Sequence, residues 1–269
     1  MERETEADRM DLKLRGRTAL ITGASKGIGR ACAEALAEEG VNVILVSRTQ
    51  SDLDAVRDSI AARWNVRSEV HAFDISDSRN VDRLADQHPD IDILVNNAGA
   101  IPGGNLQEIA EARWREAWDL KVYGYINMCR RYYALMQRRG RGVIINILGM
   151  AGERMDAGYI AGSTGNAGLM AFTRTLGGAA SVDNLRVVGV NPGAIATDRL
   201  VTMMKKRAQD QLGDASRWEE LMRPLPFGRA GMPEEIGWMV AFLASDRSAY
   251  TTGTIVTVDG GAANRGPMF

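Results

Sequence analysis

The sequence predicts one α/β domain: a doubly wound parallel sheet of about seven strands with helices on both faces. Two observations lead to this prediction. Apolar segments of strand length, rich in Val and Ile, recur along the 269 residues, and longer stretches with helical periodicity separate them. Strands that are apolar throughout are buried on both faces, and repeated strand–helix units give parallel sheets with right-handed crossovers.

The first half of the chain alternates short strands and helices. Residues 18–22 (TALIT) are the first expected strand, and residues 29–39 are a helix that ends at Gly40, because glycine commonly terminates helices. The next expected strands are 41–46, 67–73 and 91–95, with helices over 51–63 and about 81–87.

The second half contains a long helical zone from about residue 106 to 139. An aromatic stripe on it is typical of a core or, as we favour, of a contact between subunits of a homo-oligomer, a dimer or tetramer. The stripe comprises Trp114, Trp118, Tyr123, Tyr125, Tyr132 and Tyr133. The remaining expected strands are 142–147, 185–190 and 254–258, and the remaining helices are 157–181 and 234–243.

Charge and hydropathy exclude several classes of protein. Lys and Arg total 33 and Asp and Glu total 34, so the net charge is −1, which excludes a basic nucleic-acid surface. No segment approaches the ~18 consecutive apolar residues of a membrane span. Residues 1–13 form a charged N-terminal arm without the apolar core of a secretory signal, and residues 14–269 form the domain. We therefore expect a cytoplasmic protein.

The cysteines and histidines offer no ligand pattern along the sequence. Cys32 and Cys129 lie far apart, which indicates small buried residues on helices rather than a disulfide or a zinc site. His71 and His88 each stand without a partner at catalytic or metal-binding spacing. The sequence therefore predicts no metal site and no catalytic role for either histidine.

A glycine-rich turn, TGASKGIG at residues 22–29, joins the first strand to the first helix. Gly23 permits the tight turn, Gly27 lets the backbone approach a pyrophosphate, and Gly29 lets helix and strand pack closely. The helix N-terminus offers free N–H groups and partial positive charge to phosphate. This context indicates dinucleotide binding, with a purely structural turn as the alternative.

The end of the second strand indicates which dinucleotide binds. An NAD site would usually place Asp or Glu there, but the chain reads Ser47-Arg48-Thr49. Arg48 can pair with a 2′-phosphate and Lys26 adds a second positive charge, so NADP(H) is favoured over NAD(H). Asp74, after the third strand, either accepts from an adenine amino group or caps the next helix.

Three further motifs follow later strands: Asn96-Asn97-Ala98-Gly99, Asn191-Pro192-Gly193 with Thr197, and Val258-Asp259-Gly260-Gly261. Together with the glycine turn they resemble the short-chain dehydrogenase/reductase family over residues 14–262. The resemblance implies a Rossmann fold, a nicotinamide cofactor, hydride transfer between a carbonyl and an alcohol, and usually a tetramer. The expected cofactor site comprises Gly23, Ser25, Lys26, Gly27, Ile28, Gly29, Ser47, Arg48, Asp74, Ile75, Asn97, Ala98, Gly99, Pro192, Gly193, Ile195 and Thr197.

The same resemblance implies a catalytic Asn, a Ser and a Tyr-x-x-x-Lys pair, and this sequence departs from all four. The flanking motifs align Lys121 with the Asn, Gly149 with the Ser, Gly162 with the Tyr and Asn166 with the Lys. Glycine has no proton to give, so the family mechanism cannot run through residue 162.

A relocated catalytic centre is the hypothesis we favour. Tyr159 lies one helical turn before Gly162 and would lean into the space that the glycine leaves, as the acid or base. Lys121 would lower its pKa, Asn166 would give polar support, and Ser163 is a candidate for the missing hydroxyl. Gly149 and Gly162 would enlarge the pocket for a moderately bulky apolar substrate.

Two alternatives remain open. The protein is a catalytically inactive nucleotide-binding sensor or scaffold, or it catalyses an elimination or isomerisation with Lys121 or Tyr159 as base and without hydride transfer. Residues 195–228 occupy the place of the family's substrate lid, and their Met and Leu side chains suit an adaptable apolar pocket. An ordinary amphipathic helix pair explains the same segment equally well.

Overall fold

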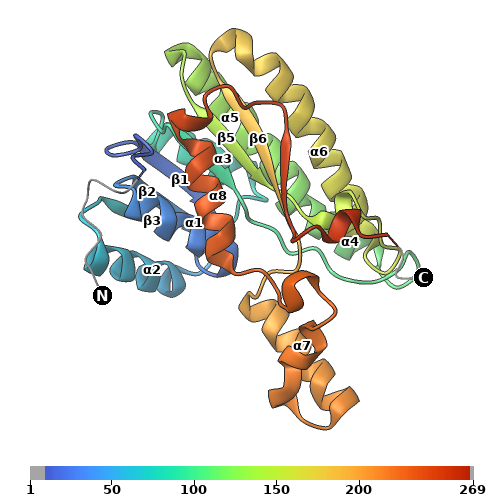
Figure 1. Cartoon of the computed structure of the whole chain (residues 1–269). Helices are drawn as coiled ribbons and strands as arrows, with labels where there is room; N and C mark the ends of the chain where they lie inside the picture. Colours follow the sequence, from blue (N-terminus) through green and yellow to red (C-terminus); the bar gives the residue numbers. More distant parts are fainter. Residues whose placement is uncertain (1–9, 267–269) are drawn as a thin grey trace.

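The computed structural model describes residues 10–266 and shows a seven-stranded parallel sheet between two layers of helices (Figure 1). The order of the strands is β3-β2-β1-β4-β5-β6-β7, which confirms the expected fold class. The strands are β1 (Thr18–Thr22), β2 (Asn42–Ser47), β3 (Ser68–Ala72), β4 (Ile93–Asn96), β5 (Val143–Ile147), β6 (Arg186–Pro192) and β7 (Ile255–Val258). Most of the charged arm, residues 1–9, lies outside the described residues.

Helices cover both faces of the sheet. One face carries α1 (Gly27–Glu38), α2 (Gln50–Arg63) and α8 (Pro233–Ala244). The other carries α3 (Ser78–Gln87), α5 (Gly124–Arg139) and α6 (Ile160–Ala180). The remaining helices are α4 (Glu111–Trp118), which leads into α5, and α7 (Asp198–Leu212), which lies beyond the strand ends.

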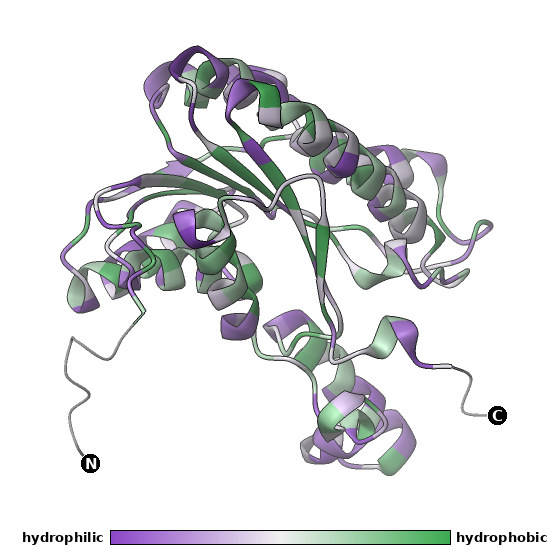
Figure 2. Ribbon diagram, turned by 45° about the horizontal axis from the view of Figure 1, so that its top comes forward, coloured by the Kyte–Doolittle hydropathy of each residue, from purple (hydrophilic) through white to green (hydrophobic). Residues whose placement is uncertain are grey.

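The central strands are buried on both sides because their successive apolar side chains enter two different cores. In β1, Ala19 and Ile21 pack with α1, α2 and α8, whereas Leu20 packs with α3 and α5. All three are fully buried. Figure 2 shows these hydrophobic strands between helices whose outer surfaces are largely hydrophilic.

The long helical zone begins five residues later than expected. The Asn105 side chain accepts hydrogen bonds from the backbone of Gln107 and Glu108, and such a turn competes with helix. From Glu111 the helix runs through one π-helical turn (Asp119–Tyr123) into α5. π-Turns inside α-helices frequently mark functional sites.

The interpretation of the aromatic stripe as a subunit contact is wrong for two of its members. Tyr125 and Tyr132 are fully buried in the chain's own core. Trp118 is also engaged internally, because its indole N–H donates to the Ala161 carbonyl at 3.1 Å. Tyr123 is 54% exposed.

The segment 195–228 forms a small lobe with its own core. α7 and a 3-10 segment (Ala215–Met222) bring Met204 and Met222 together, with Trp218 and Leu221 packed against them. This is the packing of an amphipathic helix pair. The two ends of the lobe are fastened together, because Ala196 N–H donates to the Gly231 carbonyl (2.8 Å) and Gly231 N–H donates to the Ala194 carbonyl (2.9 Å).

Cys32 on α1 and Cys129 on α5 are buried and unpaired, as expected, and burial raises the pKa of each thiol to about 12. The two histidines, in contrast, are not isolated: the Nε2 atoms of His71 and His88 lie 2.7 Å apart. Their separation of 17 residues in the sequence hides this contact. No helix within residues 10–266 combines the length and apolar character needed to span a membrane.

Candidate active site

A groove runs along the carboxyl ends of the strands where the strand order reverses between β1 and β4. Open parallel sheets bind ligands at this position. Two adjoining cavities of about 270 and 380 Å³ form the groove, and both are lined by Gly23, Lys26, Ala98 and Gly99. The first extends over β2 and the second toward β5.

The glycine turn has the shape that a pyrophosphate needs. Gly23 and Gly27 have φ values of +66° and +53°, which favour glycine. A Cβ on Gly29 would lie 2.2 Å from the Gly23 carbonyl oxygen, so only glycine allows α1 to approach the turn. No side chain caps the N-terminus of α1, and no acidic residue lies in its first turn. Its N–H groups can therefore face an anion.

The first cavity contains the residues expected to hold the adenosine end. Arg48 lines it and has no ion-pair partner among the described residues, so its guanidinium can receive an anion. Ser47 lines the same cavity, and its hydroxyl is buried without a hydrogen-bond partner among residues 10–266. Lys26 differs, because its ammonium already pairs with Asp52 of α2 at 2.9 Å. A buried, unpartnered hydroxyl beside a free cation fits a ribose phosphate.

Asp74 lies in a smaller cavity beside Arg48 and organises its own loop. Its carboxylate accepts from the backbone and hydroxyl of Ser76 (3.0 and 2.8 Å), while Asp77 caps α3. The next residue, Ile75, lines the first cavity, as does Ser25. The alternative that Asp74 caps the following helix is therefore wrong.

Asn97, which follows β4, connects the end of that strand to the glycine turn through hydrogen bonds. Its side chain donates to the Thr22 and Gly23 carbonyls, and its backbone N–H donates to the Thr22 hydroxyl (2.9 Å). Thr197, Ile28 and Asn97 line the second cavity, whereas Ile195 lines a separate one of about 120 Å³. Pro192 ends β6, and the Gly193 N–H donates to the Val258 carbonyl.

Lys121, on the π-helical turn, reaches into the second cavity. Its stem crosses Gly99, where an added Cβ would lie 2.7 Å from Lys121 Cδ. Its ammonium donates to the Leu148 carbonyl at 3.1 Å. Burial, together with a smaller effect of the positive charge of Arg199, lowers the Lys121 pKa to about 8. The ammonium thus loses its charge near physiological pH.

Asn166 lies next to Gly149. A Cβ on Gly149 would be 3.0 Å from Asn166 Nδ2, and this amide donates to the Gly162 carbonyl at 2.9 Å. Asn166 Oδ1 is buried and accepts no hydrogen bond from the described residues. The site therefore presents one free acceptor at the position where the family has its lysine.

Tyr159 begins α6, and its ring covers Gly162. A Cβ on Gly162 would lie 2.0 Å from Tyr159 Cε1 and 2.2 Å from Cζ. The phenol thus fills the space beside this glycine, and the expectation that Gly162 enlarges the pocket is wrong. Burial raises the Tyr159 pKa, and the charge that opposes this rise is that of Arg199 and not, as expected, that of Lys121. Contacts thus join Tyr159 to Gly162, Gly162 to Asn166 and Asn166 to Gly149, and Lys121 bonds Leu148, the residue before Gly149.

Arg199 escaped the sequence analysis. It lies at the start of α7, lines the second cavity and donates to the Ile101 carbonyl at 3.1 Å. It is the charge that influences both Lys121 and Tyr159. Its position two residues after Thr197, a predicted cofactor-binding residue, is the feature of the sequence that could have indicated it. Ser163, by contrast, is held elsewhere, since its hydroxyl accepts from Asp156 N–H at 3.1 Å and donates to the Asp156 carbonyl.

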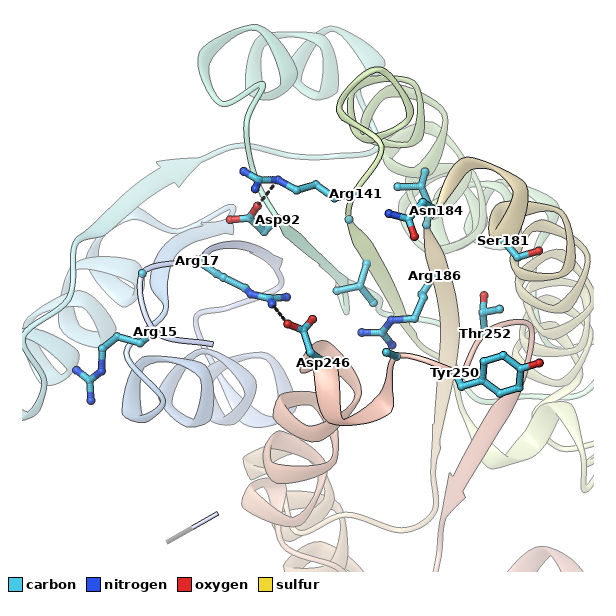
Figure 3. A pocket seen from close by; sticks show the side chains of 15 residues that line it. Arg15, Arg17, Asp92, Arg141, Ser181, Asn184, Arg186, Asp246, Tyr250 and Thr252 are labelled. Atoms are coloured by element: carbon cyan, nitrogen blue, oxygen red, sulfur yellow. Dashed lines mark hydrogen bonds and ion pairs between the residues drawn. The ribbon is translucent and has the colours of Figure 1, made fainter. Parts of the chain in front are cut away.

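A larger cavity than these, of about 980 Å³, lies at the opposite ends of the strands and is lined by none of these residues (Figure 3). Its charges are largely matched within the protein. Arg17 points to Asp246 (2.5 Å), and the Arg186 guanidinium donates to the carbonyls of Leu243 and Ser245. This cavity is therefore not the candidate active site.

Comparisons with known proteins agree with this architecture. The profile of the family described as Enoyl-(Acyl carrier protein) reductase matches residues 23–263. The 3-oxoacyl-(acyl-carrier-protein) reductase of Chlamydia trachomatis is 32% identical over 251 residues, which cover 92% of this chain and 97% of that protein. The chain belongs to the short-chain dehydrogenase/reductase family.

Solved structures of other members of the short-chain dehydrogenase/reductase family are similar throughout. L-Sorbose reductase from Gluconobacter frateurii, complexed with NADPH and L-sorbose, has a TM-score of 0.89 and 32% identity over 95% of this chain and all of that one. A 3-oxoacyl (acyl-carrier-protein) reductase from Agrobacterium tumefaciens with NADP bound has a TM-score of 0.85 and 30% identity, covering 96% and 99%.

Proposed function

We propose that this protein is an NADP(H)-dependent oxidoreductase that reduces a carbonyl, or oxidises a secondary alcohol, with a relocated catalytic centre. The observation that carries the proposal is the Tyr159 ring beside Gly162, close enough to Arg199 for its charge to act on the phenol, because Arg199 and Lys121 line the same cavity of the groove. The NADPH- and NADP-bound relatives support the choice of cofactor.

The groove would hold the dinucleotide along its length. The glycine turn and the N-terminus of α1 would bind the pyrophosphate, Arg48 and Ser47 the 2′-phosphorylated ribose, and Thr197 the nicotinamide end. When bound, the nicotinamide supplies or accepts the hydride. The residues of the chain must then orient the carbonyl group and donate one proton to its oxygen, or remove that proton in the reverse reaction.

Tyr159 is the proposed proton donor. Its raised pKa keeps the phenol protonated at neutral pH, and this form suits carbonyl reduction. Arg199, whose charge acts on the phenol, and Lys121, which lines the same cavity as Arg199, would stabilise the oxygen that becomes negative. Asn166 Oδ1, a buried free acceptor, would orient a water or a substrate hydroxyl. Ser163 is a poorer proton donor, because its hydroxyl is already hydrogen-bonded to the backbone of Asp156.

The substrate is proposed to carry a moderately bulky apolar body. The small cavity beside the lobe is lined by Met150, Ile195, Leu225, Pro226 and Phe227, among others. This apolar wall now supports the proposal in place of the glycines, because Tyr159 fills the space beside Gly162. A homo-oligomer in the cytoplasm, with a small-molecule substrate, completes the proposal.

The experiment is a reductase screen on purified protein, with NADPH oxidation followed at 340 nm. Ketoses, 3-oxoacyl thioesters and cyclic diketones are the carbonyl panel, run on wild type and on Tyr159→Phe. Turnover by wild type that Tyr159→Phe abolishes supports the relocated centre. NADPH binding without turnover of any compound favours the sensor or scaffold, and product without net NADPH change favours isomerisation or elimination.

A further inference from the structure

Three potential ligand side chains converge beside the edge strand of the sheet. Glu69 and His71 are two residues apart on β3, so they share one face. His88, the residue that follows the last turn of α3, meets them there. The His88 Nε2 lies 2.7 Å from His71 Nε2 and 3.9 Å from Glu69 Oε2.

The atoms of these three side chains that lie closest to one another are nitrogen and oxygen atoms that can bind a metal ion. All three ligand atoms lie within 4.8 Å of one another, and within residues 10–266 no other trio of His, Cys, Asp or Glu side chains converges in this way. The His88 side chain is only 13% exposed, whereas that of Glu69 is 58% exposed. The fold therefore fixes the imidazoles and leaves the carboxylate side open to solvent.

We propose that this cluster is a binding site for one divalent transition-metal ion of the zinc class. The Nε2 atoms of His71 and His88 and the Glu69 carboxylate would be the ligands, with water in the fourth position. Nitrogen and carboxylate ligands suit such ions. Tetrahedral Zn–N bonds of about 2.0–2.1 Å put two nitrogens about 3.3 Å apart, so the rings need to separate by about 0.6 Å.

The protonation state is compatible with metal binding. Without an ion, one Nε2–H donates to the other Nε2. Binding of the ion requires that ring to change tautomer, so that its proton moves from Nε2 to Nδ1 and both Nε2 atoms are free to act as ligands.

The ion would be a structural link. It would join the edge strand to the end of α3, and strand edges otherwise lack a partner on one side. The His71 ring also lies 5.5 Å from the ring of Phe73, which lines the adenosine-side cavity. The site is thus separate from the catalytic residues but adjacent to the cofactor groove.

The test uses tag-free full-length protein, because His71 and His88 are the only histidines in the chain. Competition with a chromophoric zinc chelator should give about one Zn²⁺ per chain. For a Kd of about 10 µM, 100 µM free zinc would raise Tm by about 3–6 °C. His71→Gln and His88→Gln should each weaken zinc binding at least tenfold, and Glu69→Gln several-fold. Glu219→Gln, an exposed carboxylate in the lobe, is the control and should leave the affinity unchanged.

A second measurement keeps the proposal testable if the histidine variants unfold. In ¹⁵N-labelled wild type, zinc should shift the Nε2 resonances of both imidazoles and remove the proton shared between them. Absence of stoichiometric zinc binding, retention of zinc by the His71→Gln/His88→Gln double variant, or unchanged imidazole resonances would each overturn the proposal.

Discussion

The ring of Tyr159 and the α-carbon of Gly162 are packed so closely that no side chain fits between them. A Cβ on Gly162 would lie within 2.0–2.6 Å of three ring atoms of Tyr159. A phenol at position 159 and a side chain at position 162 therefore exclude one another. The chain has room for one of the two, and it has the tyrosine at position 159.

Tyr159→Phe should abolish turnover while cofactor binding persists. The substitution removes only the hydroxyl, and a positioned proton donor contributes about 10²–10⁴-fold to the rate. We expect kcat to fall by that factor and the Kd for NADPH, measured by fluorescence titration, to stay unchanged. Tyr250→Phe, which removes a fully exposed hydroxyl, is the matched control. An active Tyr159→Phe enzyme would refute the assignment.

Restoring the family tyrosine should require removal of Tyr159. Gly162→Tyr alone overpacks the site and should destabilise the protein by about 1–3 kcal/mol. Tyr159→Ala in the same chain should recover most of that loss, which a double-mutant cycle by chemical denaturation measures as coupling. Gly168→Tyr, on the same helix with no atom within 4 Å of its Cβ position, is the control. Additive effects of the two substitutions would contradict the packing described.

Carbonyl reduction should weaken as pH rises through about 8. Burial and, to a smaller extent, the charge of Arg199 lower the pKa of the Lys121 ammonium to about 8, so its charge is present below that pH and lost above it. A kcat/KM profile from pH 6 to 10 should therefore fall on its alkaline side. Lys121→Arg keeps the charge and should move the fall to higher pH. An unchanged profile in this variant would assign the transition to another group.

Lys121 should also affect stability, in a direction set by its lowered pKa. Between pH 8 and 10.5 the unfolded chain binds more protons at this residue than the folded one, so the free energy of unfolding rises with pH there. Below pH 8 the folded state bears the full desolvation cost, on the order of 1–3 kcal/mol. Lys121→Met should thus raise Tm at pH 7 and lose that advantage toward pH 10. Thermal denaturation at both pH values tests this, with exposed Lys205→Met as control.

Arg48→Ala should relax the choice between the two dinucleotides. A charge-assisted pair with the 2′-phosphate contributes about 1.5–3 kcal/mol, so the Kd for NADPH should rise about 10–100-fold while that for NADH changes little. Isothermal titration of both cofactors measures the ratio. Arg57→Ala removes a surface arginine that pairs with Asp54 and Asp58 and should leave both affinities unchanged.

The sheet was predictable because its signals are local. Runs such as Val43–Val46 are apolar on both faces, and the glycine turn has a strand before it and a helix after it. The sequence did not predict the turn at Asn105, because the helical pattern extends back to about residue 106. In the structure a hydrogen bond between the Asn105 side chain and the backbone delays the start of the helix to Glu111. The π-turn that carries Lys121 has no sequence signal of its own.

The candidate site was predictable only where helical spacing fixed the geometry. Tyr159 and Gly162 are one turn apart, and the structure has the ring where that spacing placed it. Arg199 and the pair His71 and His88 depend on contacts between distant segments, which spacing does not encode. The sequence predicted extra space in the pocket at Gly162, because a glycine has no side chain. It could not show that the ring of Tyr159 fills this space.

The two hydrogen bonds between residues 194–196 and Gly231 give the lobe a narrow base. The chain leaves the sheet and returns to it at almost the same point, and the Met204 and Met222 cluster lies entirely between these crossings. The core of this lobe is therefore separate from the two cores that cover the sheet, so the residues around Met204 and Met222 can vary without repacking a strand. Evolution can thus alter this lobe while the β-sheet and the groove at its carboxyl ends stay fixed.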